Sequence, residues 1–253
     1  MDKKNYTIRV RDLVLGDGIP KICVPLTGRN RQELAEQIEQ VRECPHDLVE
    51  WRADYYEGER QEILQELSRI REALGKDTPI IFTFRTKEEG GEREITPEEY
   101  RKLNLAAGAE GKADLIDLEY NRGEKMIREM IQGVKEKGTM ALCSYHNFKS
   151  TPQAEKMVKI MEKMQQLGAD VVKLAVMPES SRDVLALMEA SLEMSENKGK
   201  CPFITMSMAK AGVITRLAGA LTGSAVTFAA AAQASAPGQV SAWKMPEILE
   251  IMQ

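Results

Sequence analysis

This sequence lacks the features that mark secreted, membrane-spanning and zinc-binding proteins. Its four cysteines form no CxxC pair and no zinc-type spacing. No stretch approaches the roughly 18 apolar residues of a membrane span. The opening MDKKNYTIRV has no apolar core of a signal peptide. We therefore expect a cytoplasmic protein with no bound metal and no contact with a membrane.

The sequence also lacks any concentration of charge of one sign. It has 35 lysines and arginines against 39 acidic residues, and the basic residues form no long block. Such a surface offers nucleic acid no attractive patch, so we expect no nucleic-acid partner. The composition is 43% hydrophobic and 29% charged over 253 residues, which is ample material for a core.

Short strand-like runs alternate with amphipathic segments whose apolar residues are three and four apart. Two helix starts are expected where a threonine precedes a proline, at Thr96 and at Thr151. Eight such units favour a closed (β/α)₈ TIM barrel over an open doubly wound sheet. The strand candidates span residues 21–26, 46–51, 79–85, 113–120, 139–146, 169–176, 201–208 and 223–229.

The opening stretch YTIRVRDLVLGDG predicts an additional N-terminal β-hairpin that closes the bottom of the barrel. No linker, internal repeat or low-complexity tract interrupts the chain. We therefore expect residues 1–253 to form a single (β/α)₈ barrel catalytic domain.

One strand candidate carries a lysine inside an apolar run, VVKLAV at residues 171–176. Side chains alternate between the two faces of a strand, so Val172, Leu174 and Val176 share one face and Lys173 lies on the other. The larger apolar set suits packing against helices. Lys173 is therefore predicted to point into the barrel.

The same alternation turns other polar side chains inward near the strand ends. Active sites of this fold gather at the C-terminal ends of the strands, so inward charges on five strands indicate a site. The ordinary alternatives are a lysine that reaches water along its own methylenes and a structural ion network. The inward set is Glu50, Arg52, Arg85, Asp117, Glu119, Ser144, His146 and Lys173.

His146 and Lys173 could act together as an acid–base group and a nucleophile. Strands five and six should be neighbours about 4.8 Å apart, which brings His146 close to Lys173. A partly desolvated lysine beside other cations is neutral often enough to attack a carbonyl. A histidine within reach can move protons near neutral pH. This pair favours Schiff-base catalysis.

Several segments resemble the type I 3-dehydroquinate dehydratases, in that family's order and spacing and over nearly the whole chain. The resemblance implies the dehydration of 3-dehydroquinate to 3-dehydroshikimate in the shikimate pathway, without a cofactor, by a homodimer. The segments are VRDLVLGDGIPKICVPLTG, EWRAD (50–54), FTFRTKEEGGE (82–92), DLIDLE (114–119), SYHNF (144–148), KMQQLGADVVKLAVMP (163–178), ITMSMAKAGVITRLAGALTGSAVTFAAA (204–231) and ASAPGQ (234–239).

The resemblance also implies roles for individual residues. Lys173 matches the lysine that forms an imine with the C3 ketone, and His146 matches the histidine that moves the protons. Glu89 matches a carboxylate that positions and tunes that histidine, and Arg216 matches the clamp on the substrate carboxylate. The remaining implied substrate contacts are Glu50, Arg52 and Arg85 at the ring hydroxyls, and Ser235 and Gln239 in a closing loop.

The sequence departs from the family pattern at two positions. Asn147 stands where an aspartate is expected, which removes a negative charge beside His146. A lower pKa of His146 is one consequence, and tolerated variation is the alternative. Pro25 stands where a serine is common.

Two other functions are compatible with a barrel lysine. A Schiff-base aldolase would need a glycine-rich phosphate cradle after strands seven and eight, whereas Arg216 and SAPGQ fit a carboxylate clamp and a lid better. A barrel that only binds a small anion would suit a chain that had lost its nucleophile, but Lys173, His146 and Glu89 are all present. Biosynthesis and quinate breakdown use the same reaction, so both roles stay open.

Overall fold

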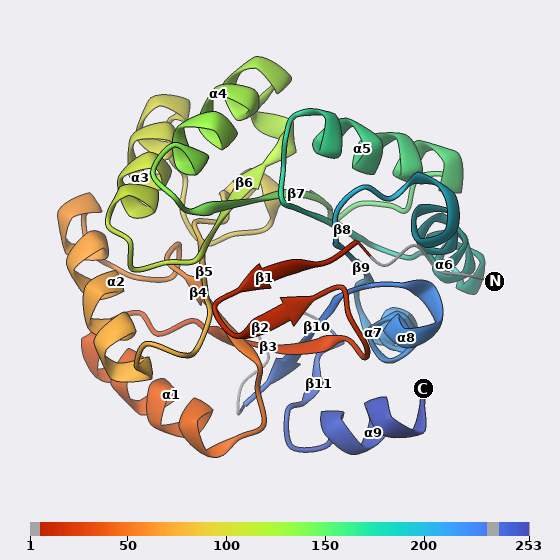
Figure 1. Cartoon of the computed structure of the whole chain (residues 1–253), viewed down its shortest axis with the longest axis horizontal. Helices are drawn as coiled ribbons and strands as arrows, with labels where there is room; N and C mark the ends of the chain where they lie inside the picture. The colour runs from red at the N-terminus through yellow and green to blue at the C-terminus, as the bar shows by residue number, and fades with distance from the viewer. Residues whose placement is uncertain (1–5, 232–237, 253) are drawn as a thin grey trace.

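The computed structural model describes residues 6–231 and 238–252 and is built on a ring of parallel strands (Figure 1). The ring closes between β9 and β10, where the Ala225 N–H donates to the Phe203 carbonyl at 2.8 Å. This arrangement confirms the predicted (β/α)₈ barrel. The strands are β3 (Lys21–Leu26), β4 (Leu48–Arg52), β5 (Ile80–Thr83), β6 (Leu115–Glu119), β7 (Met140–Asn147), β8 (Val171–Val176), β9 (Phe203–Ser207) and β10 (Val226–Ala230), with the short β11 (Val240–Ser241) beside β10.

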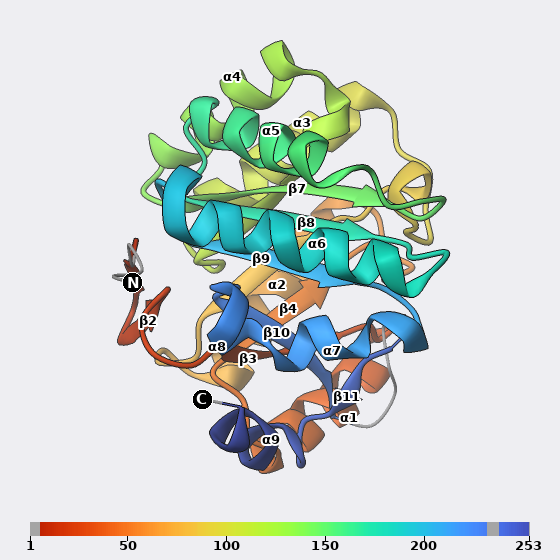
Figure 2. The same ribbon diagram turned by 90° about the vertical axis from the view of Figure 1, so that its right-hand side faces the viewer.

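Helices cover the outside of this ring (Figures 1 and 2). None of the helices in the described ranges is both long and apolar enough to cross a lipid bilayer. The α-helices are α1 (Arg31–Glu43), α2 (Arg60–Leu74), α3 (Pro97–Ala109), α4 (Glu124–Lys135), α5 (Ala154–Gln166), α6 (Ser181–Glu193), α7 (Val213–Leu217), α8 (Gly219–Thr222) and α9 (Met245–Ile251). Shorter helical turns are η1 (Lys87–Glu89), η2 (Tyr120–Arg122), η3 (Met194–Lys198) and η4 (Lys210–Gly212).

One of the two predicted helix starts is confirmed and the other is wrong. Thr96 caps α3, and its Oγ1 accepts the Glu99 N–H at 3.3 Å. The second helix, α5, begins only at Ala154. Thr151 instead donates its hydroxyl to the Met177 carbonyl at 2.8 Å, which ties the loop after β7 to the loop after β8. The N-cap position of α5 is instead Gln153, two residues later.

The N-terminal hairpin consists of β1 (Ile8–Val10) and β2 (Leu13–Leu15), paired antiparallel. It lies across one end of the ring, on the side opposite the arrowheads of the strands (Figures 1 and 2). Val10 and Leu15 are buried there in the apolar cluster inside the barrel. The hairpin therefore closes the bottom of the barrel, as the sequence predicts.

Strand side chains divide between an outer and an inner apolar cluster. On β8, Val172, Leu174 and Val176 belong to the outer cluster, which packs under the helices. Val171 belongs to the inner cluster with the hairpin residues. Lys173 therefore faces the barrel interior, where the alternation of strand side chains places it.

The third barrel strand is shorter than predicted. β5 ends at Thr83, two residues before Arg85. The Arg85 N–H donates to a side-chain oxygen of Asp54 at 3.3 Å instead of joining the strand ladder. The buried carboxylate of Asp54 thus accepts the N–H that would otherwise continue the sheet. The chain then turns into η1, which contains Glu89.

Candidate active site

Five of the eight inward polar side chains line a cavity of about 130 Å³ at the C-terminal ends of the strands, whereas Asp117, Glu119 and Ser144 are not part of its lining. The lining includes every described residue to which the family resemblance assigns a role, and Ser235 falls outside the described ranges. Those residues are Glu50, Arg52, Arg85, Glu89, His146, Lys173, Arg216 and Gln239.

Lys173 is almost fully buried, and its amine lies between acidic groups. Its Nζ is 3.2 Å from Glu50 Oε1 and 3.9 Å from Asp117 Oδ2. The amine also lies over the ring of Phe228, 4.2 Å from the ring centroid. The sequence led us to expect cations beside this lysine, but its ion pairs are with carboxylates. These partners offset the cost of burying the charged amine.

Glu50 approaches the lysine from β4, on the far side of the barrel interior. Burial favours a raised pKa for Glu50, but the charges of Lys173, Arg52 and Arg85 outweigh it, so the net pKa is lowered. Thr83 adds a hydrogen bond from its hydroxyl to Glu50 Oε1 at 3.0 Å. Glu50 is therefore ionised at neutral pH.

Arg85 connects the buried carboxylates around the lysine. Its Nη2 donates to Asp117 Oδ2 at 2.7 Å, and its Nη1 donates to Glu119 Oε1 and Ser144 Oγ, both at 3.0 Å. Burial favours a lower pKa for Arg85, but Asp117, Glu119 and Glu89 together raise it well above its usual value. The guanidinium thus stays charged and holds several acidic side chains in place.

Arg52 is fixed by a two-point ion pair at the end of β4. Its Nε and Nη2 donate to the two carboxylate oxygens of Asp54, each at 2.8 Å. Asp54 is fully buried and also accepts the Glu92 N–H at 3.1 Å. One edge of the Arg52 guanidinium is thereby held rigidly while the residue lines the cavity.

His146 is oriented by Glu89. Its Nδ1 lies 3.0 Å from Glu89 Oε2, which also accepts the backbone N–H of His146 at 3.1 Å. Burial and then the charges of Arg85, Lys173 and Arg52 hold the pKa of His146 well below its usual value. The ring is therefore neutral at pH 7. Because Glu89 Oε2 is an acceptor here, we place the ring proton on Nδ1, which leaves the Nε2 lone pair as a base.

The carboxyl group of Glu89 has an unusually high pKa. Burial, followed by the charge of Glu119, raises the pKa of Glu89 to about 8, although Arg85 acts in the opposite direction. A protonated Glu89 still offers a carbonyl oxygen to the His146 Nδ1–H. The orientation of the ring therefore does not depend on a full negative charge at Glu89.

Arg216 enters the cavity from α7 and is 2% exposed. Burial lowers the pKa of Arg216 to about 10, so it remains charged at neutral pH. Its Nη1 donates to Met206 Sδ at 3.6 Å. A planar guanidinium in a buried pocket suits the two-point recognition of a carboxylate.

The apolar lining of the cavity was not among the residues predicted from the sequence. Met206, Met208, Phe148 and Phe228 all contribute to it. The strand alternation could have found two of them, because Met206 and Met208 share a face in the segment ITMSM. Of these side chains, Phe228 contacts the Lys173 amine directly.

The two departures from the family pattern lie beside the cavity. Asn147 Oδ1 accepts the N–H groups of Lys149 and Ser150, at 2.9 and 3.1 Å, and so closes the turn after β7. The low pKa of His146 comes from burial and nearby cations. Pro25 lies in β3 and lines a neighbouring hollow together with Thr27.

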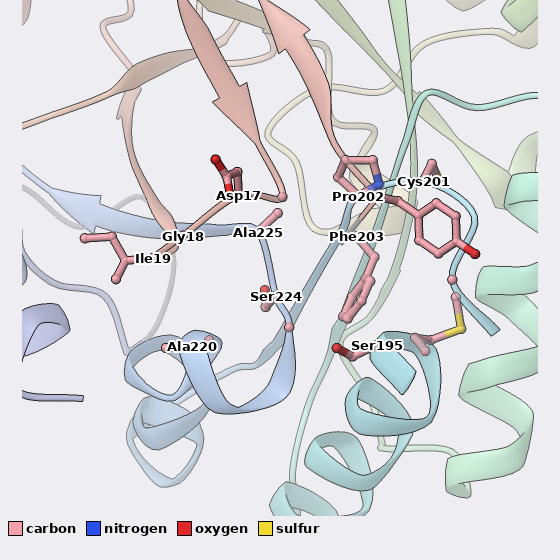
Figure 3. A pocket seen from close by; sticks show the side chains of 16 residues that line it. Asp17, Gly18, Ile19, Ser195, Cys201, Pro202, Phe203, Ala220, Ser224 and Ala225 are labelled. Atoms are coloured by element: carbon pink, nitrogen blue, oxygen red, sulfur yellow. The ribbon is translucent and has the colours of Figure 1, made fainter. Parts of the chain in front are cut away.

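A second pocket, of about 150 Å³, lies at the other end of the barrel beside the hairpin (Figure 3). Its labelled polar side chains are Asp17, Ser195 and Ser224. None of the described residues that line it is a lysine, an arginine or a histidine. An anionic ligand would meet the Asp17 carboxylate there and no lysine, arginine or histidine among the described lining residues.

The comparisons with known sequences and known structures point to the same family. The sequence model of type I 3-dehydroquinase matches residues 22–253. The 3-dehydroquinate dehydratases of Bacillus licheniformis and Clostridium novyi are each 46% identical; 97% of this chain is covered, and 97% and 98% of theirs. The crystal structure of the Clostridium difficile type I enzyme, with covalent modified comenic acid, has a TM-score of 0.93 at 38% identity and covers 98% of both chains. This chain therefore belongs to the type I 3-dehydroquinase family of hydro-lyases.

Proposed function

We propose that this chain dehydrates 3-dehydroquinate to 3-dehydroshikimate, in the shikimate pathway, through an imine on Lys173. The observation that carries the proposal is the position of the Lys173 amine. Among the described residues that line the cavity, Lys173 is the only lysine, and its Nζ is buried between Glu50 and the ring of Phe228. The related Clostridium difficile enzyme, solved with covalent modified comenic acid, supports covalent chemistry in this family.

The first half of the reaction forms an electron sink. The neutral Lys173 amine attacks the C3 carbonyl carbon, and the carbinolamine loses water to give a protonated imine. That iminium acidifies the C2 protons. His146 Nε2 takes one of them, and the electron pair of the broken C–H bond moves to form an enamine.

The second half expels the leaving group and frees the enzyme. The enamine pushes electrons toward C1, and the C1–O bond breaks as the protonated His146 gives its proton to the departing oxygen. Water leaves and the iminium is restored. A water molecule then adds to the iminium carbon, so that the C–N bond breaks and releases both the product ketone and the Lys173 amine.

The remaining site residues orient the substrate in this proposal. Glu50 and Arg52 bind ring hydroxyls, and Gln239 completes the site from the loop after β10. The family resemblance implies a substrate contact for Ser235 as well. Arg85 also faces the cavity, but its guanidinium already bonds Asp117, Glu119 and Ser144. Its main contribution is to hold those side chains.

Arg216 is proposed to clamp the substrate carboxylate, so Arg216→Lys should weaken binding more than chemistry. Lysine keeps the positive charge but loses the two parallel N–H donors. We expect KM to rise about 10- to 100-fold, the equivalent of one lost charge-assisted hydrogen bond, with a much smaller change in kcat. Steady-state kinetics measures both values. Arg60→Lys, at an exposed ion pair with Glu99, is the matched control; an unchanged KM in Arg216→Lys would contradict the clamp.

Borohydride trapping tests the imine directly. Sodium borohydride added together with 3-dehydroquinate should reduce the imine to a stable secondary amine, and peptide mass spectrometry should place a single adduct on Lys173. Borohydride without substrate is the control and should give no adduct. An adduct on another lysine, or none at all, would overturn the mechanism.

The family resemblance also implies a domain organisation, a location in the cell and an oligomeric state. We propose that residues 1–253 act as one catalytic domain and that the enzyme is a cytoplasmic homodimer. Sedimentation equilibrium over a range of protein concentrations measures the oligomeric state, and a monomer throughout that range would reject the dimer.

A further inference from the structure

Asp117 is a buried carboxylate that the catalytic scheme does not use. It lies on β6, is 1% exposed, and its Oδ2 is 3.9 Å from Lys173 Nζ. It is not among the side chains that line the cavity, so the proposed scheme gives it no contact with the substrate. Any influence of Asp117 on the reaction must therefore pass through the lysine or through the groups that hold it.

The Asp117 side chain is held in a fixed position. Its Oδ1 accepts the Ser144 hydroxyl at 2.6 Å, and its Oδ2 accepts Arg85 Nη2 at 2.7 Å. Ser144 in turn accepts Arg85 Nη1 at 3.0 Å, which closes a ring of three side chains. A carboxylate fixed by two donors cannot swing to meet the lysine, so it acts on Nζ as a charge at a set distance.

The two carboxylates near Nζ differ in their distance from it and in whether they line the cavity. Glu50, at 3.2 Å, is within hydrogen-bond distance and also lines the cavity. Asp117 is too distant for a hydrogen bond and is not part of the cavity lining. An iminium nitrogen keeps a single hydrogen, which Glu50 can accept. The remaining positive charge is then stabilised by Asp117 and by the face of Phe228.

We propose that Asp117 is a positioning residue that fixes the charge state of the Lys173 nitrogen. Its negative charge favours the protonated imine over the neutral imine, and only the protonated form is an effective electron sink. The same charge favours the ammonium form of the free lysine, so it slows imine formation at low pH. This inference rests on the proposed Schiff-base function and deepens it.

Several other charged or titratable groups surround Lys173 and must stay constant in a test. Asp117 is the one that can be changed most cleanly, because Glu50, Arg52, Glu89 and His146 line the cavity and would alter substrate contacts. The groups are Cys23 on β3, Glu50 and Arg52 on β4, Arg85 after β5, Glu89 on η1 and His146 on β7.

Glu119 supplies a matched control on the same strand. It is also fully buried, and it pairs with Arg85 at 3.0 Å, a distance close to the 2.7 Å of the Asp117 pair. Its ion pairs are with Arg85 and Arg122 and not with Lys173. Glu119→Gln therefore reproduces the loss of a buried carboxylate from Arg85 without removing a charge next to Nζ.

The experiment compares Asp117→Asn and Glu119→Gln with the unaltered enzyme. The rate at which the borohydride-trappable adduct forms with 3-dehydroquinate is measured from acidic to neutral pH, and kcat is measured alongside. In Asp117→Asn we expect the acid limb of adduct formation to move to lower pH by about one unit. We also expect kcat to fall about tenfold because less of the imine is protonated. Glu119→Gln should leave the position of the acid limb unchanged, whatever its effect on the amount of active enzyme.

Two outcomes would overturn the inference: an acid limb that stays in place in Asp117→Asn, or an equal shift in Glu119→Gln. Asp117→Ser, which is neutral and smaller, should shift the limb in the same direction and serves if the asparagine variant folds poorly. Circular dichroism monitors the fold of each variant. Failure of the unaltered enzyme to form any Lys173 adduct would instead reject the proposed function itself.

Discussion

Lys173→Ala is expected to reduce the turnover of 3-dehydroquinate by at least about 10⁴-fold, a loss of roughly 5.4 kcal/mol of transition-state stabilisation. Without the amine there is no iminium to accept electrons, and the C2 proton loses its acidity. Arg216, Arg52 and Gln239 remain, so the substrate should still bind. The absorbance of the conjugated product measures the rate, and calorimetric titration measures the binding.

The same substitution has a structural cost that must be separated from the chemistry. Removing the lysine leaves Glu50 and Asp117 buried without their shared cation, which destabilises the fold by about 3–5 kcal/mol. Lys173→Met fills the space and is the second variant. Lys87→Ala, at an exposed ion pair with Glu94, is the control and should retain full activity. Turnover within tenfold of the unaltered enzyme in either Lys173 variant would reject the nucleophile.

His146→Ala is expected to lower kcat by about 10²- to 10⁴-fold, the usual contribution of a positioned acid–base group. The Lys173 adduct should still form, because alanine leaves the amine in place. The chain has only one other histidine, His46, and its Nδ1 contacts the Cys44 carbonyl away from the cavity. His46→Ala is therefore a matched control that should keep its kcat. A nearly unchanged kcat in His146→Ala would reject the role.

The pH dependence of the unaltered enzyme follows from the same residue. Burial and the charges of Arg85, Lys173 and Arg52 hold the pKa of His146 well below its ordinary value of 6.5. A general base works when deprotonated, so its contribution is present at neutral pH and is lost as the pH falls through this lowered value. The acid limb of kcat that depends on His146 should therefore lie below pH 6.5 and disappear in His146→Ala.

The residues that face the barrel interior could be predicted from the sequence alone. The two faces of a strand follow from backbone geometry that repeats every second residue. VVKLAV was therefore enough to place Lys173 opposite Leu174, and EWRAD was enough to place Glu50 and Arg52 on the same side. The family resemblance supplied the residues outside the strands, such as Glu89 and Arg216, for which alternation gives no signal.

The neighbours of each inward side chain could not be predicted in this way. Lys173 contacts Glu50 across the barrel and lies near Asp117, which is two strands away in the sheet. Both residues are far from Lys173 in the sequence, so neither contact could be predicted from it. We expected cations beside the lysine and found carboxylates. Thr151 also differs from expectation, because its hydroxyl makes a contact between two loops that only the folded chain creates.

The sequence by itself determined the barrel, the hairpin that closes it and the inward position of Lys173 and His146, because these depend on local periodicity and on a resemblance spread along the chain. Only the tertiary structure decided the electrostatic surroundings of the lysine. Closing the strands into a ring brings side chains from distant segments to within a few ångströms of one another. In this way Glu50, Asp117 and the ring of Phe228 come to lie around the buried amine.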